Sequence, residues 1–211
     1  MPTPLLLAAL LAALLVPAHA TAAPVLGVEA FGGWNRYSMR EMNDSLQSFD
    51  RAAGTRFASF HSSIGYGFAA RAWAQDRLLL RLAYEELPAE THGSGLTFEA
   101  HARAVLLSAT WFTAPERPLR FGLGVGGGPY FAHGSFHGDD VDMKVGGIGF
   151  GGFVAGEAAL AVGGGAMLHT AAGWRIARID PIELEGRSMG AAADDSGPWL
   201  RLGVAYDAGS F

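Results

Sequence analysis

Two residues with the chemistry of a nucleophile and its base stand close together in this sequence, His61 and Ser63. An imidazole that accepts the proton of a serine hydroxyl makes the serine oxygen nucleophilic. Residues two apart share one face of a β-strand, so this spacing is compatible with such a pair. No third residue that would orient the histidine is defined, however, and polar residues at the end of a strand explain the same pattern.

A second group of candidate residues falls within one polar segment of ten residues: His133, His137, Asp139, Asp140 and Asp142. Carboxylates are suited to Ca²⁺ and imidazoles to a transition metal. The spacing matches no established metal motif, and a solvated loop has the same composition. The sequence thus offers weak candidates for catalysis and for a metal, and no cofactor is expected.

The elements that must position these groups are β-strands. Alternate residues from 64 to 74 are apolar, and the alternation resumes from 78 to 87 after a polar interruption at 75 to 77. This period is typical of a hairpin with one apolar and one polar face. Similar stretches predict eight strands, at residues 25–37, 56–74, 78–87, 96–112, 118–131, 145–162, 166–179 and 198–208.

The connections between these strands alternate between short and long. The short ones fall at residues 75–77, 113–117 and 163–165. The longer ones fall at residues 38–55, 88–95, 132–144 and 180–197. Outer-membrane barrels combine tight periplasmic turns with longer extracellular loops, so the longer connections are expected at the outer end. They carry twelve acidic residues against four arginines or lysines, which suits divalent cations better than phosphates.

Alternation alone leaves the direction of the apolar face open, because a soluble lipocalin-like barrel would turn it inward and a membrane barrel outward. Glycine and alanine recur on the polar face, as crowding inside a narrow barrel demands. Aromatic residues near strand ends on the apolar face fit interfacial girdles: Trp34, Tyr84, Phe98, Trp174 and Tyr206. Both features favour an apolar exterior and a polar lumen.

The ionisable residues on the polar face are then predicted to face the lumen. Groups confined there must pair and hydrogen-bond, so a structural network that fills the barrel is expected, with a narrow proton or ion path as the alternative. Its members are Glu29, Arg71, Arg81, Glu85, Glu99, His101, Arg103, Arg120, Glu157, His169, Arg175, Arg201 and Asp207.

The first twenty residues have the pattern of an export signal. An apolar run of twelve residues, from 5 to 16, is followed by the small-x-small triplet at 18 to 20. A spanning helix needs about 20 residues, so the run is too short for one. We predict a signal peptide at residues 1–20, cleaved between Ala20 and Ala23, and one mature domain at residues 24–211.

Composition narrows the class further. The chain has 211 residues, half of them hydrophobic, with 30 glycines and 17% charged residues, as suits one β-rich domain. The formal charge of −5 gives no electrostatic reason to expect nucleic acid as a partner. Cysteine is absent, which excludes disulfides, a thiol nucleophile and a lipidated cysteine.

The glycine-aromatic run at 121–130, the closing strand at 196–206 and the strand array carry a family resemblance. From residue 25 to 211 the chain resembles the small eight-stranded outer-membrane β-barrels, which include OmpA- and OmpX-like barrels and opacity-type surface proteins. The resemblance implies an all-β, antiparallel, up-and-down transmembrane barrel in the cell outer membrane. The family usually ends on a phenylalanine read by the barrel-assembly machinery; Phe211 is terminal here, but out of phase with Tyr206.

Three functions follow as hypotheses. The first is a monomeric outer-membrane protein with a structural, surface-interaction or adhesion role, whose partners are membrane lipid and lipopolysaccharide, an extracellular ligand or divalent cations. The second is a lipid A-modifying hydrolase, because related barrels include a deacylase with a His-x-Ser arrangement like that of His61 and Ser63. The third is a narrow pore or transporter. The first is preferred, and the protein is not expected to be an enzyme.

Overall fold

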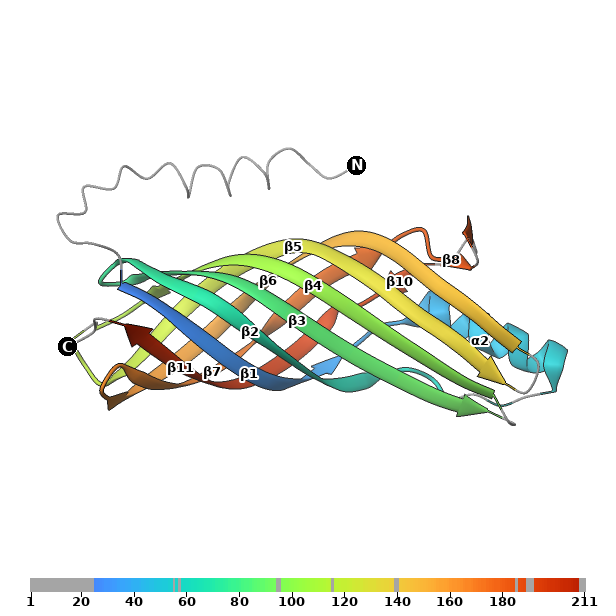
Figure 1. Cartoon of the computed structure of the whole chain (residues 1–211), viewed down its shortest axis with the longest axis horizontal. Helices are drawn as coiled ribbons and strands as arrows, with labels where there is room; N and C mark the ends of the chain where they lie inside the picture. The colour runs from blue at the N-terminus through green and yellow to red at the C-terminus, as the bar shows by residue number, and fades with distance from the viewer. Residues whose placement is uncertain are drawn as a thin grey trace.

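Eight long antiparallel strands close into a barrel in the computed structural model (Figure 1). The structure describes residues 25–208 except 55, 57, 94–95, 115, 139–140, 185 and 189–191, so the signal peptide, its cleavage site and Phe211 lie outside the described residues. The barrel strands are β1 (Val25–Arg36), β2 (Ser62–Gln75), β3 (Leu78–Gly93), β4 (Leu96–Phe112), β5 (Leu119–Gly138), β6 (Val141–Gly163), β7 (Ala166–Ile179) and β11 (Gly197–Ala208).

Each barrel strand pairs with its neighbours along the chain, and the last strand returns to the first. β11 pairs with both β7 and β1, for example at Leu200 opposite Trp34. The predicted eight-stranded, up-and-down antiparallel barrel is therefore confirmed. Closure leaves none of these eight strands with an unpaired edge in the middle of the barrel, which is what a β-structure in lipid requires.

The apolar faces of the strands point outward and form a band around the barrel, here called the apolar belt. Leu123 is 77% exposed and Ile176 is 69% exposed. Every barrel strand contributes, and representative members are Val28, Phe68, Leu82, Val105, Leu123, Val154, Ile176 and Leu202. A continuous apolar surface of this kind is unfavourable in water and favourable in a bilayer. The lipocalin-like alternative is therefore wrong.

Two of the predicted outer loops are mostly strand. β3 and β4 stay paired as far as Gly93 and Leu96, and β5 and β6 as far as Gly138 and Val141. The loops predicted at 88–95 and 132–144 are therefore corrected to tall hairpins. Their pairing continues past the apolar belt, where water replaces lipid outside, so the period-two pattern fades although the backbone ladder does not.

The outer end also carries a helix and three short strands. α2 (Arg40–Ala53) follows β1, while β8 (Glu183–Leu184), β9 (Arg187–Ser188) and β10 (Ala193–Asp194) lie between β7 and β11. Figure 1 shows α2 at the barrel end opposite the start of β1. No helix in the part of the chain that the structure describes is long and apolar enough to cross a membrane.

Candidate functional site

The centre of the lumen is organised around Arg81, which projects inward from β3. Its Nε donates to Glu29 Oε2 at 3.0 Å, and its Nη2 lies 2.8 Å from Glu157 Oε2. Its Nη1 also donates to Thr110 Oγ1 at 3.1 Å. These four residues come from four different strands and are all buried. One guanidinium thus neutralises two carboxylates and ties β1, β4 and β6 to β3 across the barrel.

His169 completes this central layer from β7. Its Nδ1 lies 3.3 Å from Glu29 Oε1, and its Nε2 lies 3.0 Å from Glu157 Oε2. The ring therefore sits between the same two carboxylates that Arg81 contacts. Glycine makes room for them, because a Cβ at Gly124 would lie 2.6 Å from Thr110 Oγ1 and 3.0 Å from Glu157 Oε1. The small residues on the inner face are needed for the network to fit.

The network continues toward the turn end of the barrel. Arg71 Nε lies 2.9 Å from Asp207 Oδ1, and Trp73 Nε1 donates to Asp207 Oδ2 at 2.8 Å. The Arg120 guanidinium lies 5.5 Å from the centroid of the Trp73 ring, within range of a cation–π contact. These residues close the lumen at the end where the chain makes its short turns.

A third layer lies on the outer side of the central one. Arg175 Nη2 donates to both carboxylate oxygens of Glu85, at 2.9 and 2.7 Å, and Arg201 Nη2 lies 3.3 Å from the same carboxylate. The Arg201 guanidinium also lies 3.8 Å from the centroid of the Phe31 ring. Ten predicted lumen residues thus lie on the inner face: Glu29, Arg71, Arg81, Glu85, Arg120, Glu157, His169, Arg175, Arg201 and Asp207.

Three predicted lumen residues on β4, Glu99, His101 and Arg103, must be corrected, because they project outward. Arg103 has half of its side chain exposed, and Glu86 on the outer face of β3 lies 3.6 Å from its Nε and 3.3 Å from His101 Nδ1. Phe98 points inward instead and is fully buried.

The predicted orientation of β4 is wrong because both faces of this strand are apolar in the part that lies within the apolar belt. Val105 faces out while Ala104 and Leu106 face in, so the charged residues alone set the predicted phase. Glu99 and His101 pair with Ser135 and His133 beyond the apolar belt, and Arg103 pairs with Phe131 at its outer edge. Water reaches the outside there, while the inside is apolar. At the outer end of β4, charged side chains therefore face outward and apolar side chains face the lumen, the reverse of the arrangement in the middle of the barrel.

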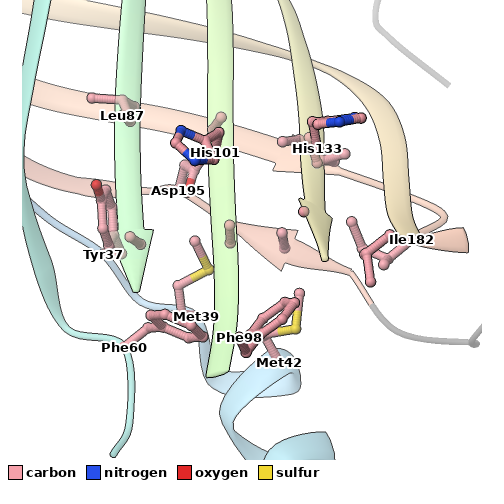
Figure 2. Close-up of a pocket in the computed structure, with 18 residues that line it drawn as sticks. Tyr37, Met39, Met42, Phe60, Leu87, Phe98, His101, His133, Ile182 and Asp195 are labelled. Carbon is pink, nitrogen blue, oxygen red and sulfur yellow. The ribbon is translucent and has the colours of Figure 1, made fainter. Parts of the chain in front are cut away.

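Above the ionic layers, the outer third of the lumen is apolar and contains a small cavity of about 40 Å³. Met39 and Met42 line it from the α2 side, and Phe60 packs edge-on against Phe98, with ring centroids 5.6 Å apart. Figure 2 shows these side chains below Asp195, which is the buried charge on the cavity wall. The polar composition of residues 180–197 predicts a solvated acidic loop around Asp195, so it gives no sign of this site.

The candidate nucleophile has a different partner from the one that the sequence suggested. Ser63 shares a hydrogen bond with the Tyr37 hydroxyl, and burial raises the pKa of that phenol. His61 is exposed, and its backbone carbonyl accepts a hydrogen bond from the Tyr37 backbone N–H. The described contacts therefore hold Ser63 as a structural hydroxyl and show no imidazole poised to take its proton.

The candidate metal residues are not gathered into a site in the described part of the chain. His133 and His137 are exposed on β5, and His137 Nε2 lies 2.7 Å from Ser135 Oγ. Asp139 and Asp140 lie outside the described residues, as does the side chain of Asp142. Among the residues that are described, no three histidine or carboxylate side chains are grouped to hold an ion.

Comparisons with known proteins find structures of similar fold but no match in sequence. No family model matches the sequence, and no curated protein matches it significantly. Neisserial surface protein A (NspA) is similar in structure, with 14% identity, a TM-score of 0.50 and coverage of 88% of this chain and 99% of that one.

A major outer membrane protein from Thermus thermophilus is also similar, with 14% identity and a TM-score of 0.57. That match covers 88% of this chain and all of the other. At this identity the likeness concerns the fold alone. Together with the apolar belt, it identifies the chain as a small eight-stranded β-barrel of the outer-membrane type.

Proposed function

We propose that this protein is a non-enzymatic barrel of a Gram-negative outer membrane that acts through the parts standing above the apolar belt. The observation that carries the proposal is the filled lumen. Buried ionic layers occupy the interior from Asp207 to Arg175, and the apolar cluster with Met39 and Phe98 occupies the outer third. With the interior occupied, the surface outside the membrane is what remains for interaction.

The filled lumen argues against the pore hypothesis. Conduction needs a continuous wet path, whereas Arg81, Glu29 and Glu157 join strands on different sides of the barrel at 2.8 to 3.0 Å. Opening a path would separate buried charges, which costs several kcal/mol, of the order of 3 to 5. We therefore regard these residues as a structural brace between opposite walls.

The surface above the belt is large and polar. The β3–β4 and β5–β6 hairpins extend past the belt and present exposed Glu90, Glu99, His137 and Lys144. α2 adds a polar outer face with exposed Asp44 and Gln47. Such a rigid, hydrophilic platform supports a role in contact with surfaces, divalent cations or the lipopolysaccharide layer. Insertion by the barrel-assembly machinery and a monomeric state are parts of the same proposal.

The lipid A hydrolase remains the weaker hypothesis. It would require an activated hydroxyl near the lipid surface, but Ser63 is engaged by Tyr37 and His61 does not reach it among the described contacts. We therefore infer that His61 and Ser63 fix the junction between β1 and β2 rather than perform acyl transfer.

One set of strains tests the function. A trimmed variant lacks residues 135–137 and 142–144, which pair with one another as three rungs of the β5–β6 hairpin. We expect cells with the full-length protein to attach to surfaces or to each other more than cells without it. The trimmed variant is expected to insert normally but to attach no more than cells without the protein. The exposed turn variant Asp76→Asn should attach as well as the full-length protein.

Two measurements on the same strains address the alternatives. Mass spectrometry of lipid A is expected to show the same acyl chains with and without the protein, since a changed acyl count would establish a hydrolase. Purified protein in planar bilayers is expected to give no steady conductance. Stable single-channel steps that change in Arg81→Met would instead establish a pore through the lumen.

A further inference from the structure

The outer end of the barrel is closed by two chain segments that are hydrogen-bonded to each other. We call residues 37–53 and 192–196 the outer plug. The Met39 N–H donates to Asp194 O at 3.0 Å, and the Ser38 N–H donates to Ser196 O at 3.1 Å. Glu41 Oε2 accepts the Ala192 N–H at 3.0 Å. Hydrogen bonds therefore join the two segments of the outer plug, which together cover the apolar cavity.

The carboxylate of Asp195 lies at the joint between the outer plug and the barrel. The residue is 2% exposed, its backbone N–H donates to Ala177 O, and neither carboxylate oxygen has a hydrogen-bond partner among the described residues. The charged and titratable groups around it are Arg175 on β7, Glu85 on β3, Tyr130 on β5, and Tyr37 and Asp194 within the outer plug. Arg175 uses its Nη2 to bind both oxygens of Glu85, while its Nε and Nη1 make no hydrogen bond with the described residues and leave its charge close to Asp195.

The closed arrangement thus carries two local costs. A buried carboxylate without hydrogen bonds is unfavourable when it is ionised, and much less so when it is protonated. Met39 adds a backbone cost, because its φ of 42° is left-handed and rare for a residue with a side chain. Lifting the outer plug would end both costs, because water would then reach Asp195 and the Met39 backbone could relax.

We propose that the outer plug is a pH-dependent gate, which closes over the apolar cavity when Asp195 is protonated and opens when Asp195 is ionised. Opening hydrates the carboxylate, so the open form is favoured as the pH rises. Burial raises the pKa of Asp195 to about 6, which brings the change into a range that cells encounter. The ionic layers below do not need to move, so the barrel stays shut at its centre.

The chain contains no cysteine, which makes a direct test possible. Ala102 is buried on the inner face of β4 and lines the cavity, so Ala102→Cys introduces a thiol that only an open plug exposes. The rate of modification by a membrane-impermeant thiol reagent is measured on folded protein in detergent and divided by the rate for Gln47→Cys on the exposed face of α2. We expect this ratio to rise about tenfold from pH 5 to pH 8.

Three further variants make the result decisive. Asp195→Asn removes the charge and should give a low ratio at every pH, while Asp194→Asn should keep the pH dependence. Asn43→Ala breaks a clamp in which Asn43 Nδ2 donates to Phe60 O at 3.0 Å and Asn43 Oδ1 accepts the Phe60 N–H at 2.8 Å. It should raise the ratio throughout and keep the slope, even if Asp195→Asn fails to fold. A pH-independent ratio, or an unchanged slope in Asp195→Asn, would overturn the gate.

Discussion

Arg81 and Glu157 meet across the barrel lumen with 2.8 Å between Nη2 and Oε2, although β3 and β6 are separated by two strands around the wall. The contact therefore spans the interior rather than following the sheet. Glu29 reaches the same guanidinium from β1 at 3.0 Å, so three walls of the barrel converge on one cation. A cross-brace of this kind resists flattening of a narrow barrel.

The first prediction concerns that brace. Arg81→Met keeps an unbranched side chain but removes the guanidinium and leaves Glu29 and Glu157 without their shared cation, so the free energy of unfolding should fall by about 3 to 5 kcal/mol. Urea titration in detergent, followed on gels that separate folded from heated protein, measures the change. Adding Glu157→Gln should recover part of the loss, and Arg77→Met in the exposed turn serves as control. Equal effects of Arg81→Met and Arg77→Met would refute the brace.

The second prediction tests the corrected orientation of β4. Arg103→Leu acts on an outward, half-exposed side chain, so stability should change by no more than about 0.5 kcal/mol. Ala102→Arg would bury a charge against the apolar cavity and should cost several kcal/mol, of the order of 3 to 5. The same unfolding measurement compares the two variants. The opposite order of effects would restore the orientation predicted from sequence.

The third prediction concerns the apolar belt. Leu123 is 77% exposed and lies between the exposed Phe121 and Val125 on the outer face of β5, so Leu123→Arg would place a charge within the apolar belt. A penalty of about 2 to 4 kcal/mol is expected for such a change near the bilayer midplane. Insertion into lipid vesicles measures it, with Gln47→Arg on α2 as the control. If both variants insert equally well, the belt does not face lipid.

The fourth prediction compares two glycines on β6. A Cβ at Gly149 would lie 2.0 Å from the Arg178 backbone oxygen, whereas a Cβ at Gly156 would meet nothing within 4 Å. Gly149→Ala must therefore push β6 and β7 apart and should lower the yield of folded barrel, while Gly156→Ala should be neutral. Refolding yield is read from gel mobility. A normal yield for Gly149→Ala would show that the strands can separate without cost.

The fifth prediction is a pH dependence of stability. The pKa of Asp195 in the folded protein is raised to about 6 by burial, above its ordinary value of 3.8, so ionisation opposes folding. This penalty is absent below about pH 4 and grows up to about pH 6, reaching about 3 kcal/mol where the outer plug stays closed and less where opening hydrates the carboxylate. Because other carboxylates titrate as well, the informative quantity is the difference in unfolding free energy between the wild type and Asp195→Asn. A difference that does not vary from pH 4 to pH 7 would contradict the buried, unpaired carboxylate.

Much of the barrel follows from patterns in the amino-acid sequence alone. Period-two alternation identifies residues that share a face, and the crowding of glycine beside charged residues such as Arg71 and Arg175 indicated the inner one. For seven of the eight barrel strands the apolar face lies on the side predicted. These features are local, since they depend only on the pleat of a single strand and on whether its two faces differ.

The ion-pair partners, and the residues that depart from the sequence pattern, depend on long-range packing. Arg81 finds Glu157 only because closure and stagger bring β3 and β6 to the same height across the lumen. Arg103 faces outward because it shares one face of β4 with Val105, and at the outer edge of the belt lipid no longer dictates which face is apolar. Asp195 is buried because α2 folds back over the barrel mouth, a long-range contact that the polar composition around residue 195 does not encode.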